Sequence, residues 1–336
     1  MPNNITRRSF LGTMASTGLA LQLSGATLNL FDRKAKTTIG IITDLHQDIM
    51  HNGYDRLSAF AERMKKIRPD ALLQMGDLAY PGDKNKAVID LFNNAHPVRM
   101  HVIGNHDTDA GYTKQQCIDY WGMPARYYTK EINGICFIIL DGNDKGSPAY
   151  KGGYPSYINK EQTDWLQQQL QGTSKPVIIV SHQPLAGSLA VDNAAEIQQL
   201  LSAHAEKILI AINGHTHIDS HLFIDGINYV HINSASYFWV GGKFKHNSYP
   251  ERIHKEHPYI AYTCPYQDAL FTTLTIDPSA GLVQIKGCKS QWVGASPEAL
   301  HYFADKDAMA TPGEIVPWIS ERNIKQRTKS RGKDQA

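Results

Sequence analysis

The strongest constraint on how this chain folds is a repeated arrangement in which a short apolar run ends in a polar cluster. The apolar runs lie at residues 39–43, 71–75, 98–103, 177–180 and 208–212. The clusters that follow them hold, in chain order, Asp44 with His46, then Asp77, then Asn105 with His106 and Asp107, then His182, then His215 with His217. Such runs are typical of buried strands. Because open α/β sheets bind ligands at the carboxyl ends of their strands, we expect the clusters to meet at one edge.

Helical patterns separate these runs, which indicates a layered α/β fold. Apolar residues recur at helical spacing from Tyr54 to Ile67, and Pro69 closes that helix. Further helices are expected near 84–92, 160–170 and 194–203, and further strands at 135–140, 221–224, 228–232, 270–276 and 282–285. We find no internal repeat and no clean linker. We therefore expect one domain over residues 36–300, with residues 301–336 as a C-terminal extension that ends in a basic, solvated tail.

The clusters together supply the donor atoms of a metal site. Two carboxylates, one amide oxygen and four imidazoles are available, and no thiolate is among them. These donors are Asp44, His46, Asp77, Asn105, His182, His215 and His217. Hard oxygen mixed with imidazole suits Fe, Mn, Zn or Co, and it disfavours Cu(I) or an iron–sulfur cluster. Seven ligands are too many for one mononuclear zinc site, but they suit two ions that share a carboxylate.

The motifs D-x-H, G-D, G-N-H-D, H and G-H-x-H occur here in one order between residues 44 and 217. In this the chain resembles the calcineurin-like metallophosphoesterase superfamily. The resemblance implies a layered sandwich of two mixed β-sheets flanked by helices. It also implies two transition-metal ions that activate a water molecule for attack on phosphorus.

The resemblance further implies a role for each residue of these motifs. Asp44, His46, Asp77 and His217 would hold the first metal ion. Asp77 would bridge to the second ion, which Asn105, His182 and His215 complete. His106 would not be a ligand but would face the leaving group as proton donor or charge stabiliser, with Asp107 orienting its ring. Alternatively, His106 contacts the metal ligands and takes no direct part in the reaction.

Tyr80 leaves two branches of the superfamily open. The segment from Gly76 to Tyr80 matches the G-D-x-x-Y of purple acid phosphatases, in which the tyrosine is an iron ligand. Those enzymes, however, carry glycine at the position of His46. With His46 in place, the chain is more similar to class III cyclic nucleotide phosphodiesterases and related glycerophosphodiesterases. We therefore expect Tyr80 to pack or to line the pocket, and a phosphomonoesterase stays as the alternative.

Two aromatic-rich segments, residues 150–157 and 237–266, could shape the substrate pocket, although packing in a cap or a subunit contact would also explain them. A diester needs room for a second organic group, whereas a monoester dianion wants additional cations. The motif segments hold few additional cations. We therefore predict a phosphodiesterase for small organic phosphodiesters, such as 3′,5′-cyclic nucleotides or glycerophosphodiesters. Lys243, Lys245 and Arg252 are the residues that would favour a monoester if they folded over the metals.

The N-terminal sequence predicts export. Residues 6–12, Thr-Arg-Arg-Ser-Phe-Leu-Gly, resemble the twin-arginine motif, and a mildly apolar stretch too short to span a membrane stably follows them. We expect residues 1–26 to be a signal peptide, the twin-arginine machinery to be a partner, and the mature protein to be periplasmic or extracellular and without a membrane span.

Composition and charge weigh against two other functions. The formal net charge of +2 supplies no broad positive field for nucleic acid, which disfavours a nuclease. A catalytically silent scaffold is disfavoured because the complete donor set and His106 are present. The four cysteines show no C-x-x-C spacing, which argues against a zinc ribbon or a thioredoxin-like motif.

Overall fold

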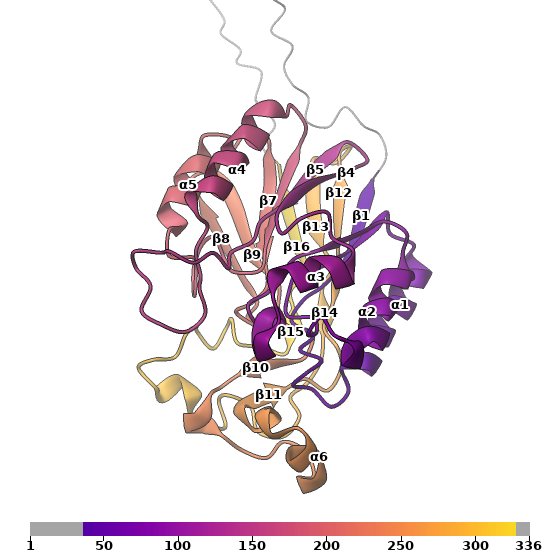
Figure 1. Ribbon diagram of the computed structural model, residues 1–336, viewed down its shortest axis with the longest axis vertical. Coiled ribbons are helices and arrows are strands. Elements are labelled where there is room, and N and C mark those ends of the chain that lie inside the picture. The colour runs from indigo at the N-terminus through magenta and orange to yellow at the C-terminus, as the bar shows by residue number, and fades with distance from the viewer. Residues whose placement is uncertain (1–35, 327–336) are drawn as a thin grey trace, which may run out of the picture.

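Residues 36–326, which the computed structural model describes, fold into two six-stranded mixed sheets that face each other across the main apolar core (Figure 1). Ile39 and Ile41 contribute to this core from the first sheet, and Phe137 and Ile178 contribute from the second. The two facing sheets and their covering helices confirm the predicted fold class. The predicted signal peptide lies outside the described residues.

The first sheet has the strand order β16-β13-β12-β1-β2-β3. Its strands β1, β2 and β3 run parallel to one another, whereas β12, β13 and β16 extend it by antiparallel pairing from β1. These strands are β1 (Thr37–Ile42), β2 (Ala71–Gln74), β3 (Arg99–His101), β12 (Thr272–Asp277), β13 (Leu282–Ile285) and β16 (Arg322–Lys325).

The second sheet has the order β4-β5-β6-β7-β9-β8, in which the four central strands are parallel and both edge strands are antiparallel to their neighbours. Its strands are β4 (Tyr128–Ile132), β5 (Ile135–Ile139), β6 (Val177–Ser181), β7 (Ile208–Asn213), β8 (Ser220–Ile224) and β9 (Ile227–His231). Central parallel strands buried on both faces explain the continuous apolar runs of the sequence.

Helices cover the outer face of each sheet (Figure 1). On the first sheet, α1 (Gly53–Ile67) and α2 (Lys86–Ala95) bury Phe60 and Phe92 against its apolar side chains. On the second sheet, α4 (Lys160–Gly172) and α5 (Ala194–Ser202) bury Leu166 and Ile197 in the same way. Each helix is therefore held by one apolar face.

The remaining elements are short. The strands β10 (Tyr237–Trp239) and β11 (Thr263–Pro265) pair as an antiparallel ribbon, which lies with α6 (Glu251–Glu256) beyond one end of the sheets, at the bottom of Figure 1. The other short elements are α3 (Lys114–Trp121), β14 (Cys288–Lys289), β15 (Trp318–Ile319) and the 3₁₀ turns Asp83–Asn85, His106–Gly111, Gly242–Phe244, Pro258–Tyr262 and Tyr302–Ala304.

Part of the predicted C-terminal extension, residues 301–336, belongs to the first sheet. Strand β16 pairs with β13 in the first sheet, and its Arg322 guanidinium lies 2.7 Å from the Asp219 carboxylate. The basic residues Arg322 and Lys325 of this extension thus belong to a strand and not to a solvated tail. Positions 327–336 lie outside the described residues.

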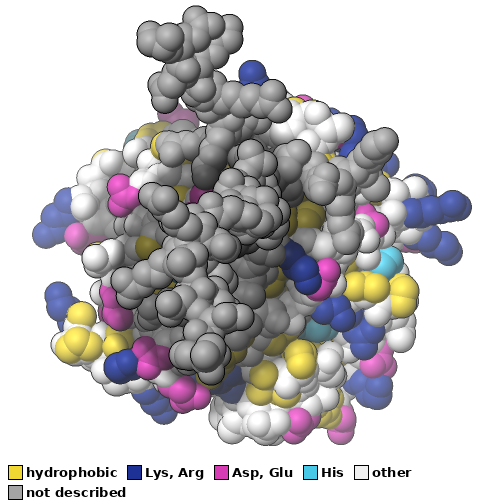
Figure 2. Space-filling model, turned by 90° about the horizontal axis from the view of Figure 1, so that it is seen from above, with side chains coloured by type: hydrophobic (Ala, Val, Ile, Leu, Met, Phe, Trp, Pro, Cys, Tyr) yellow, Lys and Arg dark blue, Asp and Glu magenta, His cyan; other side chains and the backbone are white. Residues whose placement is uncertain are grey.

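One face of the molecule carries both signs of charge. On the face shown in Figure 2, basic and acidic side chains are interspersed, and neither sign forms an extended area among the residues that are coloured there. None of the helices within residues 36–326 has the length and apolar character needed to cross a membrane.

Candidate metal centre

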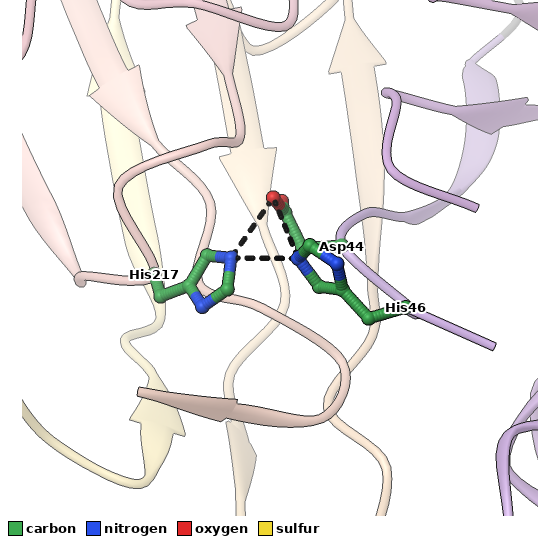
Figure 3. Close-up of side chains that lie close together, drawn as sticks. All are labelled: Asp44, His46 and His217. Carbon is green, nitrogen blue, oxygen red and sulfur yellow. Dashed lines mark hydrogen bonds and ion pairs between the residues drawn. The ribbon is translucent and has the colours of Figure 1, made fainter. Parts of the chain in front are cut away.

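All seven predicted ligands lie at the carboxyl ends of strands in the two sheets, and six of them form two compact groups. Asp44, His46 and His217 make up the first group (Figure 3), and Asp77, His182 and His215 make up the second. Within each group, one donor atom per residue lies within 4.8 Å of the others. These sets match the division between two ions that the resemblance implied.

The first group brings its donor atoms into one small space. The Nε2 atom of His217 lies 3.1 Å from Asp44 Oδ1 and 3.1 Å from His46 Nε2. The carboxylate and the two rings point toward one another in Figure 3. His217 nevertheless lies 171 residues from His46 and 173 residues from Asp44 in sequence.

Asp77 lies between the two groups. Its Oδ2 atom is 3.2 Å from His182 Nε2 in the second group and 3.6 Å from His46 Nε2 in the first. Asn105 joins the second group, because its Oδ1 atom lies 3.2 Å from His182 Nε2. This is the placement expected of a bridging carboxylate and of an amide ligand to the second ion.

The atoms behind the donors hold them in a metal-binding orientation. The Nδ1–H of His182 donates to the Met75 carbonyl at 2.7 Å, which leaves Nε2 free to face the second group. The Asp44 carboxylate accepts the hydroxyl of Thr43 at 2.5 Å and the backbone N–H of His215 at 3.1 Å. Such partners fix the tautomer and the direction of a metal ligand. The mixed oxygen and imidazole donors fit Fe, Mn, Zn or Co.

The electrostatics of the site also favour bound cations. Asp44 and Asp77 are buried, and within residues 36–326 their ion-pair partners are all histidines. Burial alone would raise the pKa of Asp44, but the imidazoles of His217 and His182 lower it to about 2. Buried carboxylates without Lys or Arg partners are costly unless they coordinate metal ions.

The backbone is strained at the ligands themselves. Five of them have a positive φ: Asp44 (54°), His46 (50°), Asp77 (52°), His215 (68°) and His217 (52°). Non-glycine residues adopt this left-handed conformation rarely, and it concentrates at functional sites because the surrounding structure must maintain it. Each of these loops therefore turns sharply at the ligand, and the turn directs its side chain toward the centre.

Two glycines of the motifs are required by close packing around the carboxylates. A Cβ atom on Gly104 would collide with the carboxylate and backbone nitrogen of Asp77. A Cβ atom on Gly214 would collide with Thr43 and with the carboxylate of Asp44. The glycines in G-N-H-D and G-H-x-H thus allow loops of different strands to approach the metal-binding carboxylates.

The expected pairing of His106 with Asp107 is wrong. Asp107 is buried and accepts the backbone N–H groups of Asp77, Leu78 and Gly104 at 2.7–2.9 Å, so it fixes the ligand loops. The carboxylate at the ring of His106 belongs to Asp109, whose Oδ2 lies 2.8 Å from His106 Nδ1.

Tyr154 completes this arrangement from the first aromatic segment. Its hydroxyl donates to Asp109 at 2.8 Å and lies 3.1 Å from His106 Nδ1. Neither Asp109 nor Tyr154 was identified as a site residue from the sequence. The signal for Asp109 was its placement three positions after His106, which a 3₁₀ turn brings onto the same side. The signal for Tyr154 was its place in the aromatic segment 150–157.

A cavity of about 770 Å³ extends from the metal-binding groups to the aromatic segments. Side chains from both predicted segments line it, and Tyr80 lies in its wall as expected. Besides the site residues, the lining consists of Asp48, Ile49, Tyr80, Lys84, Ala110, Leu189, Thr216, Tyr237, Phe238, Trp239, Tyr259 and Met309.

The basic residues of the second segment do not line this cavity. Lys243 Nζ pairs with Asp305 at 2.5 Å, and Lys245 Nζ lies over the ring of Tyr262, 5.0 Å from its centre. Arg252 is exposed on α6. The cation in the cavity wall is Lys84, whose Nζ lies 3.5 Å from the Asp48 carboxylate.

Comparison with known proteins gives a family and a fold. The model of a family described as calcineurin-like phosphoesterase matches residues 37–219. A probable cyclic nucleotide phosphodiesterase of Synechococcus is 27% identical over 173 residues. That match covers 48% of this chain and 63% of the relative, so the chain spans less than two thirds of its length.

Two solved structures share the fold. A dimetal phosphatase from Danio rerio has a TM-score of 0.55 at 14% identity, over 76% of this chain and 98% of that protein. GAP50, described as the anchor in the inner membrane complex of Plasmodium, has a TM-score of 0.50 at 14% identity, over 83% of this chain and 96% of that protein. At these identities the likeness concerns the fold alone.

Proposed function

Because this chain belongs to the calcineurin-like phosphoesterase family, we propose that it hydrolyses small organic phosphodiesters with two transition-metal ions. The predicted class, a metal-dependent phosphoester hydrolase, is confirmed at the level of the family. The observation that carries the proposal is the meeting of two donor groups, with Asp77 between them, at the inner end of a cavity.

In the proposed reaction, Asp44, His46, Asp77 and His217 would hold one ion, and Asp77, Asn105, His182 and His215 would hold the other. When bound there, two such ions would supply Lewis-acid stabilisation of the phosphoryl oxygens and would lower the pKa of the attacking water. His106 donates a proton to the leaving-group oxygen. Its side chain is 34% exposed, and its ring centre lies 5.2 Å from that of His46, so it can reach a group bound beside the metals.

Two features of the cavity favour a diester over a monoester. A volume of about 770 Å³ accommodates an organic group of considerable size. Among residues 36–326, the lining offers several aromatic rings but no Lys or Arg other than Lys84, and Lys84 is paired with Asp48. A monoester dianion would gain from further cations, whereas the second alcohol of a diester would gain from apolar contacts. The naming of the Synechococcus relative as a phosphodiesterase points the same way.

A phosphomonoesterase is the second candidate. It is favoured by Lys84, whose ammonium group would bind the phosphate dianion of a monoester if it separated from Asp48. Kinetics with bis(p-nitrophenyl) phosphate and p-nitrophenyl phosphate separate the two, because both release the same leaving group. We expect a higher kcat/KM for the diester, with an Asp77→Asn variant as the inactive control. A higher kcat/KM for the monoester would contradict the diesterase proposal.

We also propose export through the twin-arginine pathway, on the sequence of residues 6–12 alone. Replacing Arg7 and Arg8 together by lysine should retain the full-length precursor in the cytoplasm, because the pathway reads the paired guanidinium groups. The measurement is fractionation followed by immunoblotting, with Arg322→Lys as a control for lysine substitution elsewhere. Unchanged export of the double variant would contradict the proposal.

A further inference from the structure

Tyr237 occupies a special position in the cavity wall. Its ring stacks on the imidazole of His46, with ring centres 4.9 Å apart and an angle of 29° between the planes. The same ring lies edge-on to His217, again with centres 4.9 Å apart. It therefore contacts both histidines of the first metal-binding group from the cavity side.

Hydrogen bonds fix this ring relative to the ligand loop. The hydroxyl of Ser234 donates to the Asp44 carbonyl at 2.9 Å and accepts the backbone N–H of Tyr237 at 3.3 Å. The hydroxyl of Ser236 donates to the Leu45 carbonyl at 2.7 Å. Met50 and Ile260 pack against the ring. The phenol thus has little freedom to move with respect to the first group.

The hydroxyl of Tyr237 differs from the other phenols of the cavity. Tyr237 is 1% exposed, whereas Tyr154 and Tyr259 are 46% and 59% exposed. Tyr154 already donates its hydroxyl proton to Asp109. Within residues 36–326, no hydrogen-bond partner is found for the hydroxyl of Tyr237. The Tyr237 side chain is buried, but its hydroxyl oxygen is not enclosed by the protein, so a group bound in the cavity can reach it.

We propose that the Tyr237 hydroxyl donates a hydrogen bond to a phosphoryl oxygen of the substrate held at the metal-binding groups. This inference rests on the proposed phosphoester chemistry and adds a substrate-contacting donor that the metal motifs do not include. A phenol at neutral pH is a donor without charge, so it can stabilise a phosphoryl oxygen without selecting a dianion. A donor aimed at developing negative charge contributes most in a site that excludes water.

The test is Tyr237→Phe, which keeps the ring that contacts His46 and His217 and removes only the hydroxyl. The matched control is Tyr229→Phe, because Tyr229 is also buried but lies in β9, away from the cavity. Three quantities are measured on metal-loaded protein: metal content, the dissociation constant of inorganic phosphate by calorimetry, and kcat/KM for bis(p-nitrophenyl) phosphate.

We expect Tyr237→Phe to keep its metal ions, to bind inorganic phosphate about 10-fold more weakly, and to lose about 10- to 100-fold in kcat/KM. Tyr229→Phe should match the wild type in all three. Unchanged phosphate affinity and kcat/KM in Tyr237→Phe would overturn the inference and leave the proposed function standing. Loss of metal ions would also overturn it, because the ring contact would then explain the defect. A metal-loaded wild type that neither binds phosphate nor cleaves either ester would overturn the proposed function, and the inference with it.

Discussion

The imidazole of His106 is fixed by a carboxylate and a phenol that come from different parts of the chain. Asp109 follows it in the same 3₁₀ turn, and Tyr154 reaches over from the first aromatic segment. With Nδ1–H donated to Asp109, the Nε2 atom has no hydrogen-bond partner within residues 36–326 and is available for a leaving group. Asp109 is thus a positioning residue for the proton donor of the proposed reaction.

Asp109→Asn should therefore lower kcat without removing the metal ions. The amide cannot supply the negative charge that favours a protonated, correctly oriented imidazole, and we expect a loss of about 10- to 100-fold. The loss should be larger for an alkyl leaving group than for p-nitrophenolate, which needs no proton. The measurement is kcat for a pair of phosphodiesters that differ in the leaving group, together with metal analysis.

Asp119→Asn is the matched control for this experiment. Asp119 is an exposed carboxylate of α3 that accepts the side-chain amide of Gln115 and lies outside the cavity wall. An equal loss for both leaving groups in Asp109→Asn would exclude a role through proton donation.

The error over Asp107 shows what motif spacing can predict for a single residue. The motif placed Asp107 beside His106 in sequence, but neighbouring side chains in a turn point in different directions. Asp107 points back into the protein and accepts three backbone N–H groups, whereas Asp109 shares the side of His106. The ligand positions were predictable because each follows an apolar strand. The orientation of a side chain within a loop was not, because it depends on φ and ψ.

At the scale of elements, buried strands and amphipathic helices were predictable, and half-exposed elements were not. Strand β5 and helix α1 were located within about one residue of their observed bounds because their apolar periodicity is strong. Strand β4 was missed because its three central residues are exposed. Helix α3 was missed because Cys117 and Trp121 are its only buried residues, which is too few for a clear helical periodicity. A reciprocal cap between Thr113 and Gln116 stabilises its first turn.

The wall of the cavity is formed in part by elements that the sequence pattern did not predict. The ribbon of β10 and β11 is only three residues long in each strand, and tertiary contacts rather than periodicity hold it. Its aromatic composition was compatible with a place in the pocket or with packing in a cap or subunit contact, and its side chains line the cavity. Its position over the first metal-binding group follows from the hydrogen bonds of Ser234 and Ser236 to the ligand loop, which no sequence pattern revealed.

At the scale of the whole molecule, the candidate metal centre joins the two sheets. Asp44, Asp77 and Asn105 follow strands of the first sheet, whereas His182 and His215 follow strands of the second. Ions held by all of them would connect the sheets at the carboxyl ends of their strands. The same ions would compensate two buried carboxylates whose ion-pair partners within residues 36–326 are all histidines.

Removing the metal ions should therefore lower the stability of the entire domain and not only its activity. A ligand that binds only the folded state at about 100 times its Kd stabilises it by about 2.7 kcal/mol, which corresponds to about 4 °C in Tm for a domain of this size. We expect prolonged chelation to lower Tm by that amount or more, and added Mn²⁺ or Zn²⁺ to restore it. Asp77→Asn is the control, because a variant that lacks the bridging carboxylate should respond little to the chelator. If metal analysis shows that the ions have left while Tm stays unchanged, they do not connect the sheets, and the two groups of ligands are held together by the packing of the protein alone.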